Sequence, residues 1–380
     1  NYSKDIIELL ALKVTATFND KIIDDVISVE EIQDTVEIVL IQTSYVDVAK
    51  SYILYRKQHE NIRNMSSTFL DYKDTINNYL KISDWRVKEN STVTYSVGGL
   101  ILSNSGAITA NYWLSEIYDQ EIEKAHRDAD IHIHDLSMLT GYCAGWSLKQ
   151  LITEGLGGVP GKITSKPASH LSTLCNQMTN FLGIMQNEWA GAQAFSSFDT
   201  YLAPFVKADN LTYKETKQCI QSFIYGVNTP SRWGTQAPFT NITLDWVVPN
   251  DMAELNAIVG GKEMDFKYKD CVKEMAMINK AFIEIMIEGD ANGRGFQYPI
   301  PTYSITKDFD WSETENNKLL FEMTAKYGTP YFSNYINSDM EPSDVRSMCC
   351  RLRLDLRELR KKSGGFFGSG ESTGSVGVVT

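Results

Sequence analysis

The fold class is decided by two strand-like runs, Phe239–Val248 (FTNITLDWVV) and Tyr298–Ile305 (YPIPTYSI). Both runs are rich in the β-branched and aromatic residues that strands favour. Helix-like stretches lie around residues 168–190 and 211–226. Strands that alternate with long helical connections indicate an α/β architecture, either layered or closed into a barrel.

Composition and charge exclude several classes of protein. The 380 residues are 43% hydrophobic and 22% charged, which is typical of a folded globular protein. The formal net charge is −12, which argues against a nucleic acid polymer as partner, although helix N-termini could still hold a mononucleotide. No apolar run approaches the roughly 18–20 residues of a membrane span, so we expect no membrane partner.

The N-terminal part of the chain has helical periodicity. Apolar residues recur every three to four positions in residues 29–40 (VEEIQDTVEIVL) and again in residues 46–56 (VDVAKSYILYR). A short turn at residues 43–45 separates them. The pattern predicts a small helical module, which composition alone would assign to an accessory bundle.

The segment Asp130–Leu136 (DIHIHDL) alternates polar and apolar residues with period two, which predicts a strand. His132 and His134 would then face the same side. Such a pair fits either a metal site or a hydrogen-bonded structural pair, and no third or fourth ligand is evident nearby. A second motif, Gly368–Gly377, resembles a phosphate-binding loop but lacks the G-K-[ST] ending. We therefore expect residues 364–377 to form a Gly/Ser-rich surface loop.

The six cysteines contain no C-x-x-C pair and are too few for a disulfide scaffold, which indicates a reducing, cytoplasmic compartment. Cys175, Cys219 and Cys271 lie on apolar, helix-like stretches and are expected to be core residues. Cys143 follows the predicted strand in a small-residue stretch, and Cys350 lies between a turn and a charged segment. Loops display reactive side chains, so these two thiols indicate a thiol enzyme of unspecified type.

Several strings together resemble the large subunit of anaerobic, class III, ribonucleotide reductase, a glycyl radical enzyme. In chain order they are Asp130–Leu136 (DIHIHDL), Asn228–Phe239 (NTPSRWGTQAPF), Phe296–Tyr303 (FQYPIPTY), Met348–Arg351 (MCCR) and Gly377–Thr380 (GVVT). The N-terminal module resembles the second half of an ATP-cone, the helical regulatory domain of these reductases. The resemblance implies a partial ATP-cone over residues 1–63, a linker over 64–91 and an α/β barrel over 92–380. The family barrel has ten strands, in two antiparallel halves of five parallel strands each.

The resemblance also implies roles for individual residues. The string Met348–Arg351 resembles the finger loop inside the family barrel, which places the thiyl radical on Cys350 with Met348 beside the site. The family's second, reducing thiol lies on the strand after the DIHIHDL string, and its counterpart is Cys143. In the family a glycyl radical oxidises the finger-loop thiol, which takes the 3′ hydrogen of a ribonucleoside triphosphate. The 2′-hydroxyl then leaves as water. ATP and dNTP effectors control the reaction, a radical S-adenosylmethionine enzyme installs the glycyl radical, and the enzyme is a homodimer.

Two positions depart from the pattern of the formate-using members of the family. Those members carry Asn before the cysteine that corresponds to Cys143 and just before the GVV string. At these two positions this chain has Tyr142 and Ser375. Formate is therefore in doubt as reductant, and a dithiol protein, or the extra thiol Cys349, becomes the alternative. The structural zinc site and the glycyl radical loop of the family have no counterpart in these 380 residues, and both ends look cut. We therefore expect the segment by itself to be inactive.

Two other readings stay open. One is another glycyl radical enzyme, of the formate-lyase or dehydratase type, which shares the barrel and the finger-loop cysteine. The other is a catalytically dead barrel fused to a nucleotide-sensing cone. The cone-like segment favours a reductase over the first reading, and the presence of both thiols disfavours the second.

Overall fold

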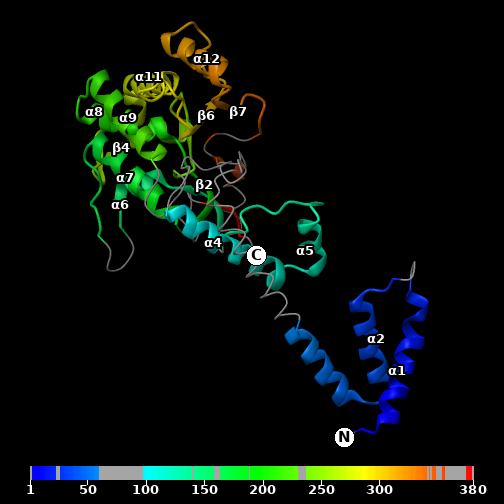
Figure 1. Ribbon diagram of the computed structural model, residues 1–380. Coiled ribbons are helices and arrows are strands. Elements are labelled where there is room, and N and C mark those ends of the chain that lie inside the picture. Colours follow the sequence, from blue (N-terminus) through cyan, green and yellow to red (C-terminus); the bar gives the residue numbers. More distant parts are fainter. Residues whose placement is uncertain are drawn as a thin grey trace. The chain divides into compact units, whose positions relative to one another are not determined.

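The computed structural model divides into two compact units, residues 1–77 and 78–380 (Figure 1). It describes residues 2–22, 26–59, 97–138, 141–157, 163–187, 189–229, 237–339, 342, 345–347, 353–355 and 374–378. None of the described helices combines the length and apolar character that crossing a bilayer requires.

The first unit is helical, as predicted. Its elements are α1 (Lys4–Phe18), a 3-10 turn η1 (Asn19–Lys21), α2 (Val29–Gln42) and a helix over residues 46–59. Ser28 and Glu31 form a capping box at the start of α2. Arg56 binds three carboxylates of α2: Asp34 at 2.6 Å, Glu37 at 2.8 Å, and Glu30. These partners raise the pKa of Arg56 above its ordinary value and hold the third helix against α2.

The predicted strand at Asp130–Leu136 is wrong. The second unit begins with α4 (Val97–Tyr112), a π-helical turn η3 (Trp113–Ile117) and α5 (Gln120–Arg127), and residues 131–135 follow as irregular chain. No described strand pairs with this segment. Its contacts are instead to the preceding helices: the Ile133 N–H donates to Nδ1 of His126 (3.2 Å), and Leu136 is buried against Trp113. The alternation reflects this one-sided packing.

The main sheet has six strands in the order β10-β1-β2-β3-β6-β7. Neighbouring strands from β1 to β7 are parallel, and β10 pairs antiparallel with β1. Their bounds are β1 Gly141–Trp146, β2 Trp189–Phe195, β3 Thr240–Leu244, β6 Ile300–Ile305, β7 Tyr331–Asn334 and β10 Gly374–Val378. The two opening strand predictions are confirmed, each within shorter bounds. The α/β class is confirmed as well.

Part of the predicted Gly/Ser-rich loop is a strand. Residues 374–377 belong to β10, because β1 provides a partner for their backbone groups. The other described strands form two small antiparallel pairs, β4 (Asn256–Val259) with β5 (Lys262–Lys267), and β8 (Val345–Ser347) with β9 (Arg353–Asp355). The ten-stranded barrel therefore stays a prediction.

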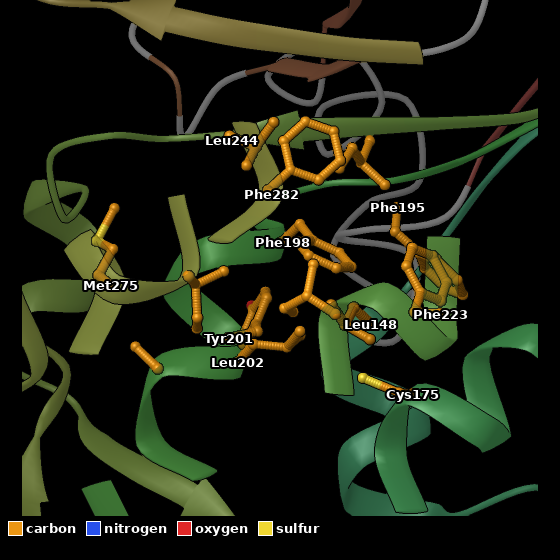
Figure 2. Packing of buried hydrophobic residues seen from close by; sticks show 14 of the residues in the cluster. Leu148, Cys175, Phe195, Phe198, Tyr201, Leu202, Phe223, Leu244, Met275 and Phe282 are labelled. Atoms are coloured by element: carbon orange, nitrogen blue, oxygen red, sulfur yellow. The ribbon is translucent and has the colours of Figure 1, made fainter. Parts of the chain in front are cut away.

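Helices pack against one face of the parallel sheet. They are α6 (Leu148–Glu154), α7 (Leu171–Met185), α8 (Phe198–Ala208), α9 (Tyr213–Asn228), α10 (Asn250–Ala253), the 3-10 turn η4 (Tyr268–Cys271), α11 (Val272–Glu288) and α12 (Glu315–Tyr327). The core between sheet and helices is apolar (Figure 2). Leu244 and Phe195 come from strands, Phe282 comes from α11, and the rings of Phe198 and Phe223 lie 5.3 Å apart.

A buried carboxylate joins three of these elements. Asp199, in the first turn of α8, is fully buried, and each of its oxygens accepts two hydrogen bonds. The donors are the backbone N–H groups of Thr200 (3.1 Å), Asp245 (2.8 Å) and Trp246 (2.9 Å) and the Asn279 amide of α11 (2.9 Å). Burial raises the pKa of Asp199 above its ordinary value, and the four donors oppose that shift. The carboxylate thus fixes the end of β3 against α8 and α11.

Replacing Asp199 by asparagine should destabilise the protein. In the wild type, four N–H donors bind the two carboxylate oxygens of Asp199. In Asp199→Asn one of these oxygens becomes an NH₂ group, which is itself a donor, so at least one of the four loses its acceptor. We expect a loss of roughly 2 kcal/mol in the free energy of unfolding, measured by urea denaturation at pH 7. The exposed Asp265→Asn variant is the matched control and should change it by less than about 0.5 kcal/mol. Equal stability of the two variants would contradict this account.

Candidate active site around Cys143

Cys143 lies within β1, on a strand as the family resemblance implied; its small-residue stretch alone had suggested a loop. The β1–β2 register shifts between Tyr142 and Ala144, so two residues of β2 stand opposite the single residue Cys143. The backbone of Cys143 is left-handed, with φ of 53°, which is uncommon for a residue other than glycine. Such a bulge redirects a side chain out of the regular alternation of the strand. The irregular pairing of β1 with β2 is thus located at this thiol.

The thiol of Cys143 is shielded from solvent. Its residue is 1% exposed, and the backbone N–H of Ala192 donates to Sγ at 3.4 Å. Strand β1 is paired on both sides, which fixes the position of the thiol, and burial keeps water away from it.

Strand β10 brings the distant C-terminal residues to this site. Tyr142 pairs with Gly377 and Ala144 with Ser375, so the backbone of β10 runs directly beside Cys143. Tyr142 and Ser375 are the two positions at which the chain departs from the formate-using pattern. In the fold they lie in the same small region of the sheet, on either side of Cys143.

The other predicted catalytic residues, Met348, Cys349 and Cys350, lie outside the described residues. The three cysteines expected in the core are in place: Cys175 and Cys271 are buried and Cys219 is half-buried. Burial raises the pKa of the Cys175 thiol far above its ordinary value, raises that of Cys271 to about 12 and raises that of Cys219. These thiols have the character of inert packing residues.

The histidine pair does not form a metal centre with described residues. The rings of His132 and His134 lie edge to face, 4.6 Å apart, and both residues are exposed. Within the part of the chain that the structure describes, no group of three or more His, Cys, Asp or Glu side chains is placed to hold a metal ion.

A set of buried polar residues was not a candidate from the sequence. Asn241 and Thr243 on β3 and Thr302 on β6 are 1%, 7% and 2% exposed. They lie on the sheet face opposite the apolar core, since Ile242, Leu244 and Tyr303 occupy the alternate positions. The alternation of Asn241 and Thr243 with Ile242 and Leu244 was the available signal. It reads equally well as a strand with one solvent-exposed face.

A cavity of about 260 Å³ opens at the carboxyl ends of β3 and β6. Its lining includes Asp245, Ser304, Thr306, Lys307 and Tyr335. In parallel α/β sheets, ligands bind outside the carboxyl ends of the strands, so this edge is a second feature of the candidate site.

Comparison with known families decides the assignment. The family model of the anaerobic ribonucleoside-triphosphate reductases matches residues 89–380, more than half of the chain. The chain belongs to this family. The ATP cone domain model matches residues 1–61, in front of the reductase match.

Individual reductases are distant in sequence. The anaerobic ribonucleoside-triphosphate reductase of Escherichia coli K12 is 23% identical over 242 residues, covering 56% of this chain and 33% of that protein. The Salmonella typhimurium LT2 enzyme is 24% identical over the same shares. The chain thus spans about a third of the length of the curated relatives it matches.

Solved reductase structures share the fold. The anaerobic ribonucleotide reductase from Thermotoga maritima in complex with dATP and CTP superposes with a TM-score of 0.53 at 20% identity, covering 76% of this chain and 52% of that one. The same protein with citrate in its active site gives 0.52 at 23% identity, covering 74% and 54%.

The burial of the four described cysteines predicts their order of alkylation. Cys219, which is half-buried, should react with iodoacetamide first, because the other three are shielded. We expect Cys143 and Cys175 to react more slowly than Cys219 by at least roughly tenfold in the native reductase, since they need an opening of the fold. Peptide mass spectrometry after timed labelling measures the rates, and the same labelling in urea is the control that should abolish the differences. Native labelling of Cys143 as fast as in urea would contradict its burial.

Proposed function

We propose that the protein to which this chain belongs reduces ribonucleoside triphosphates to 2′-deoxyribonucleoside triphosphates in the absence of oxygen, under nucleotide control through the ATP-cone. The observation that carries this proposal is the position of Cys143. A shielded thiol at a bulge in the family's parallel sheet, beside a strand from the far end of the chain, suits the second active-site cysteine.

The sheet topology supports the ten-stranded barrel. The strands β1, β2, β3, β6 and β7 are parallel, which is the content of one half of such a barrel. The next strand at the β1 edge, β10, runs antiparallel, as a strand of the opposing half would. We assign the barrel to residues 92–380, the linker to 64–91 and the partial cone to 1–63.

The residue roles follow the family chemistry. Cys350 acts as the thiyl radical that takes the hydrogen atom from C3′ of the ribose and later returns it, with Met348 beside it. Cys143 supplies hydrogen to the sugar as the 2′-hydroxyl leaves as water. Exchange of that hydroxyl for hydrogen consumes two electrons and two protons. Oxidation of a dithiol to a disulfide supplies all of them, whereas oxidation of formate to carbon dioxide supplies two electrons and one proton, and the second proton comes from the medium. The shielding of Cys143 protects the sugar radical from side reactions.

We favour a dithiol protein as the reductant. The two positions where formate-using members carry Asn, here Tyr142 and Ser375, flank Cys143 in the sheet, so the change falls at the reducing thiol itself. Cys349 is an extra thiol next to Cys350 that could pass reducing equivalents to the site.

The remaining components come with the family. A glycyl radical would supply the hydrogen-atom abstraction that activates Cys350, and zinc would be structural; neither is held by described residues. The partners are a radical S-adenosylmethionine activating enzyme and a second copy of the chain, in the cytoplasm. ATP and dNTP would act as allosteric effectors.

The first test is reduction of CTP or ATP by the full-length protein with its activating enzyme under anaerobic conditions. The wild type should form the deoxynucleotide. Cys350→Ala and Cys143→Ser should form none above background, because each removes a hydrogen-transferring thiol. Cys219→Ser is the matched control and should keep activity. Product formation by Cys350→Ala, measured by chromatography, would refute the assignment.

The choice of reductant has its own test. With a reduced dithiol protein as the sole electron donor, the full-length enzyme should turn over, and with formate alone it should not. In the Cys349→Ser variant, formate should still give no product, because the departures at Tyr142 and Ser375 persist. Turnover of that variant with formate alone would overturn the dithiol proposal.

A further inference from the structure

The parallel sheet has a second face that differs from its helix-covered face. On β3, Ile242 and Leu244 enter the apolar core, so Asn241 and Thr243 point to the opposite side. On β6, Tyr303 and Ile305 enter the core, so Thr302 points to the same side as Thr243, its partner in the register. These three residues, Asn241, Thr243 and Thr302, form what we call the polar face.

The polar groups of this face are buried without partners among the described residues. Both amide atoms of Asn241 and the hydroxyl oxygens of Thr243 and Thr302 accept or donate no hydrogen bond there. By contrast, the hydroxyl of Thr240, on the other face of β3, donates to the Pro238 carbonyl at 2.7 Å. Buried polar atoms almost always form hydrogen bonds. Three side chains on adjacent strands that form none with described residues therefore indicate a ligand-binding site.

The polar face adjoins both features of the candidate active site. Asn241 is in register with Ala194 of β2, which is in register with Gly145 of β1, two residues from Cys143. Two strand spacings, roughly 10 Å, separate β3 from β1. Between them, β2 places Ala194 in register with Asn241, so at that position of the face it adds only a methyl side chain. In the other direction, Ser304 continues the face into the cavity at the carboxyl ends of the strands.

The chemistry of the face selects an uncharged ligand group. None of the residues in β2, β3 and β6 is charged, so these strands offer no cation for a triphosphate. An asparagine amide offers a donor and an acceptor side by side, and threonine hydroxyls serve as either. Such groups match the hydroxyls of a ribose or the polar edge of a base. They suit an enzyme that must accept several bases, since the amide can present either atom.

We propose that Asn241, assisted by Thr243 and Thr302, binds the nucleoside part of the substrate and positions it relative to Cys143, which lies two strands away in the same sheet. The inference rests on the proposed function, because it takes a ribonucleoside triphosphate as the ligand. Asn241 is a positioning residue: it holds the substrate, and the thiols carry out the hydrogen transfers.

The test measures two quantities for each variant, the dissociation constant of CTP and the melting temperature of the ligand-free protein, because a binding role and a structural role predict opposite results. In the full-length protein without a glycyl radical and with saturating dNTP effector, Asn241→Leu and Thr302→Val should raise the dissociation constant of CTP by roughly tenfold, because a hydrogen bond to the ligand is lost. Neither variant should lower the melting temperature of the ligand-free protein, since each replaces an unpaired buried polar group by an apolar group of similar size. A purely structural role for Asn241 would lower the melting temperature and leave CTP binding unchanged.

The matched control is Thr240→Val, on the same strand. It removes a hydroxyl that is paired within the fold, so it should lower the melting temperature and leave the dissociation constant of CTP within about twofold. Comparison of CTP with ATP then separates two forms of the proposal: an equal loss for both nucleotides indicates contact with the ribose, and unequal losses indicate contact with the base. CTP binding by Asn241→Leu within twofold of the wild type would overturn the inference. Failure of the wild type to bind or reduce CTP would instead refute the proposed function.

Discussion

The geometry of the second unit, residues 78–380, depends on the buried carboxylate of Asp199. A charge buried in an apolar core is tolerated only when it is fully hydrogen-bonded, and here four donors from three segments supply those bonds. Two of the donors, the N–H groups of Asp245 and Trp246, belong to the sharp turn that ends β3, where Trp246 has a φ of 63°. The carboxylate therefore holds the carboxyl end of the sheet, and the cavity there, at a set distance from α8 and α11. Asp245 is in turn bound by the Thr200 hydroxyl at 2.7 Å, which continues the network into the cavity wall.

The two faces of the sheet perform different tasks. The helix-covered face carries the hydrophobic stabilisation, through residues such as Phe195, Leu244 and Phe282. The other face holds Asn241 and its neighbours, whose unpaired groups each cost about 1–3 kcal/mol by general experience. A fold can retain such groups because the apolar face offsets their cost. The bulge at Cys143 leaves the rest of this region regular, since the register shift lies between β1 and β2 and the pairing of β3 with β6 stays intact.

The site around Cys143 is assembled from segments that are far apart in the chain. The pairing of Tyr142 with Gly377 joins residues that lie far apart in the chain. It also gathers the two departures from the formate-using pattern, Tyr142 and Ser375, around one thiol. In the sequence these departures are two separate observations. In the fold they describe a single change in the surroundings of Cys143, the thiol that we propose as the reducing cysteine.

The sequence by itself determined the types of several elements and the family. Helical periodicity in residues 29–40 predicted a helix, and the β-branched run Phe239–Val248 predicted a strand. Both elements were confirmed, because such patterns reflect local backbone preference and the burial of one side of the segment. The spaced family strings named Cys143 as a candidate. Only the tertiary structure decided that Asp130–Leu136 packs on helices instead of pairing as a strand, that β10 forms beside β1, and that Asn241 faces away from the helices. The physical reason is that periodicity shows which side of a segment is buried. The segment that buries it is determined by contacts between parts of the chain that are distant in sequence.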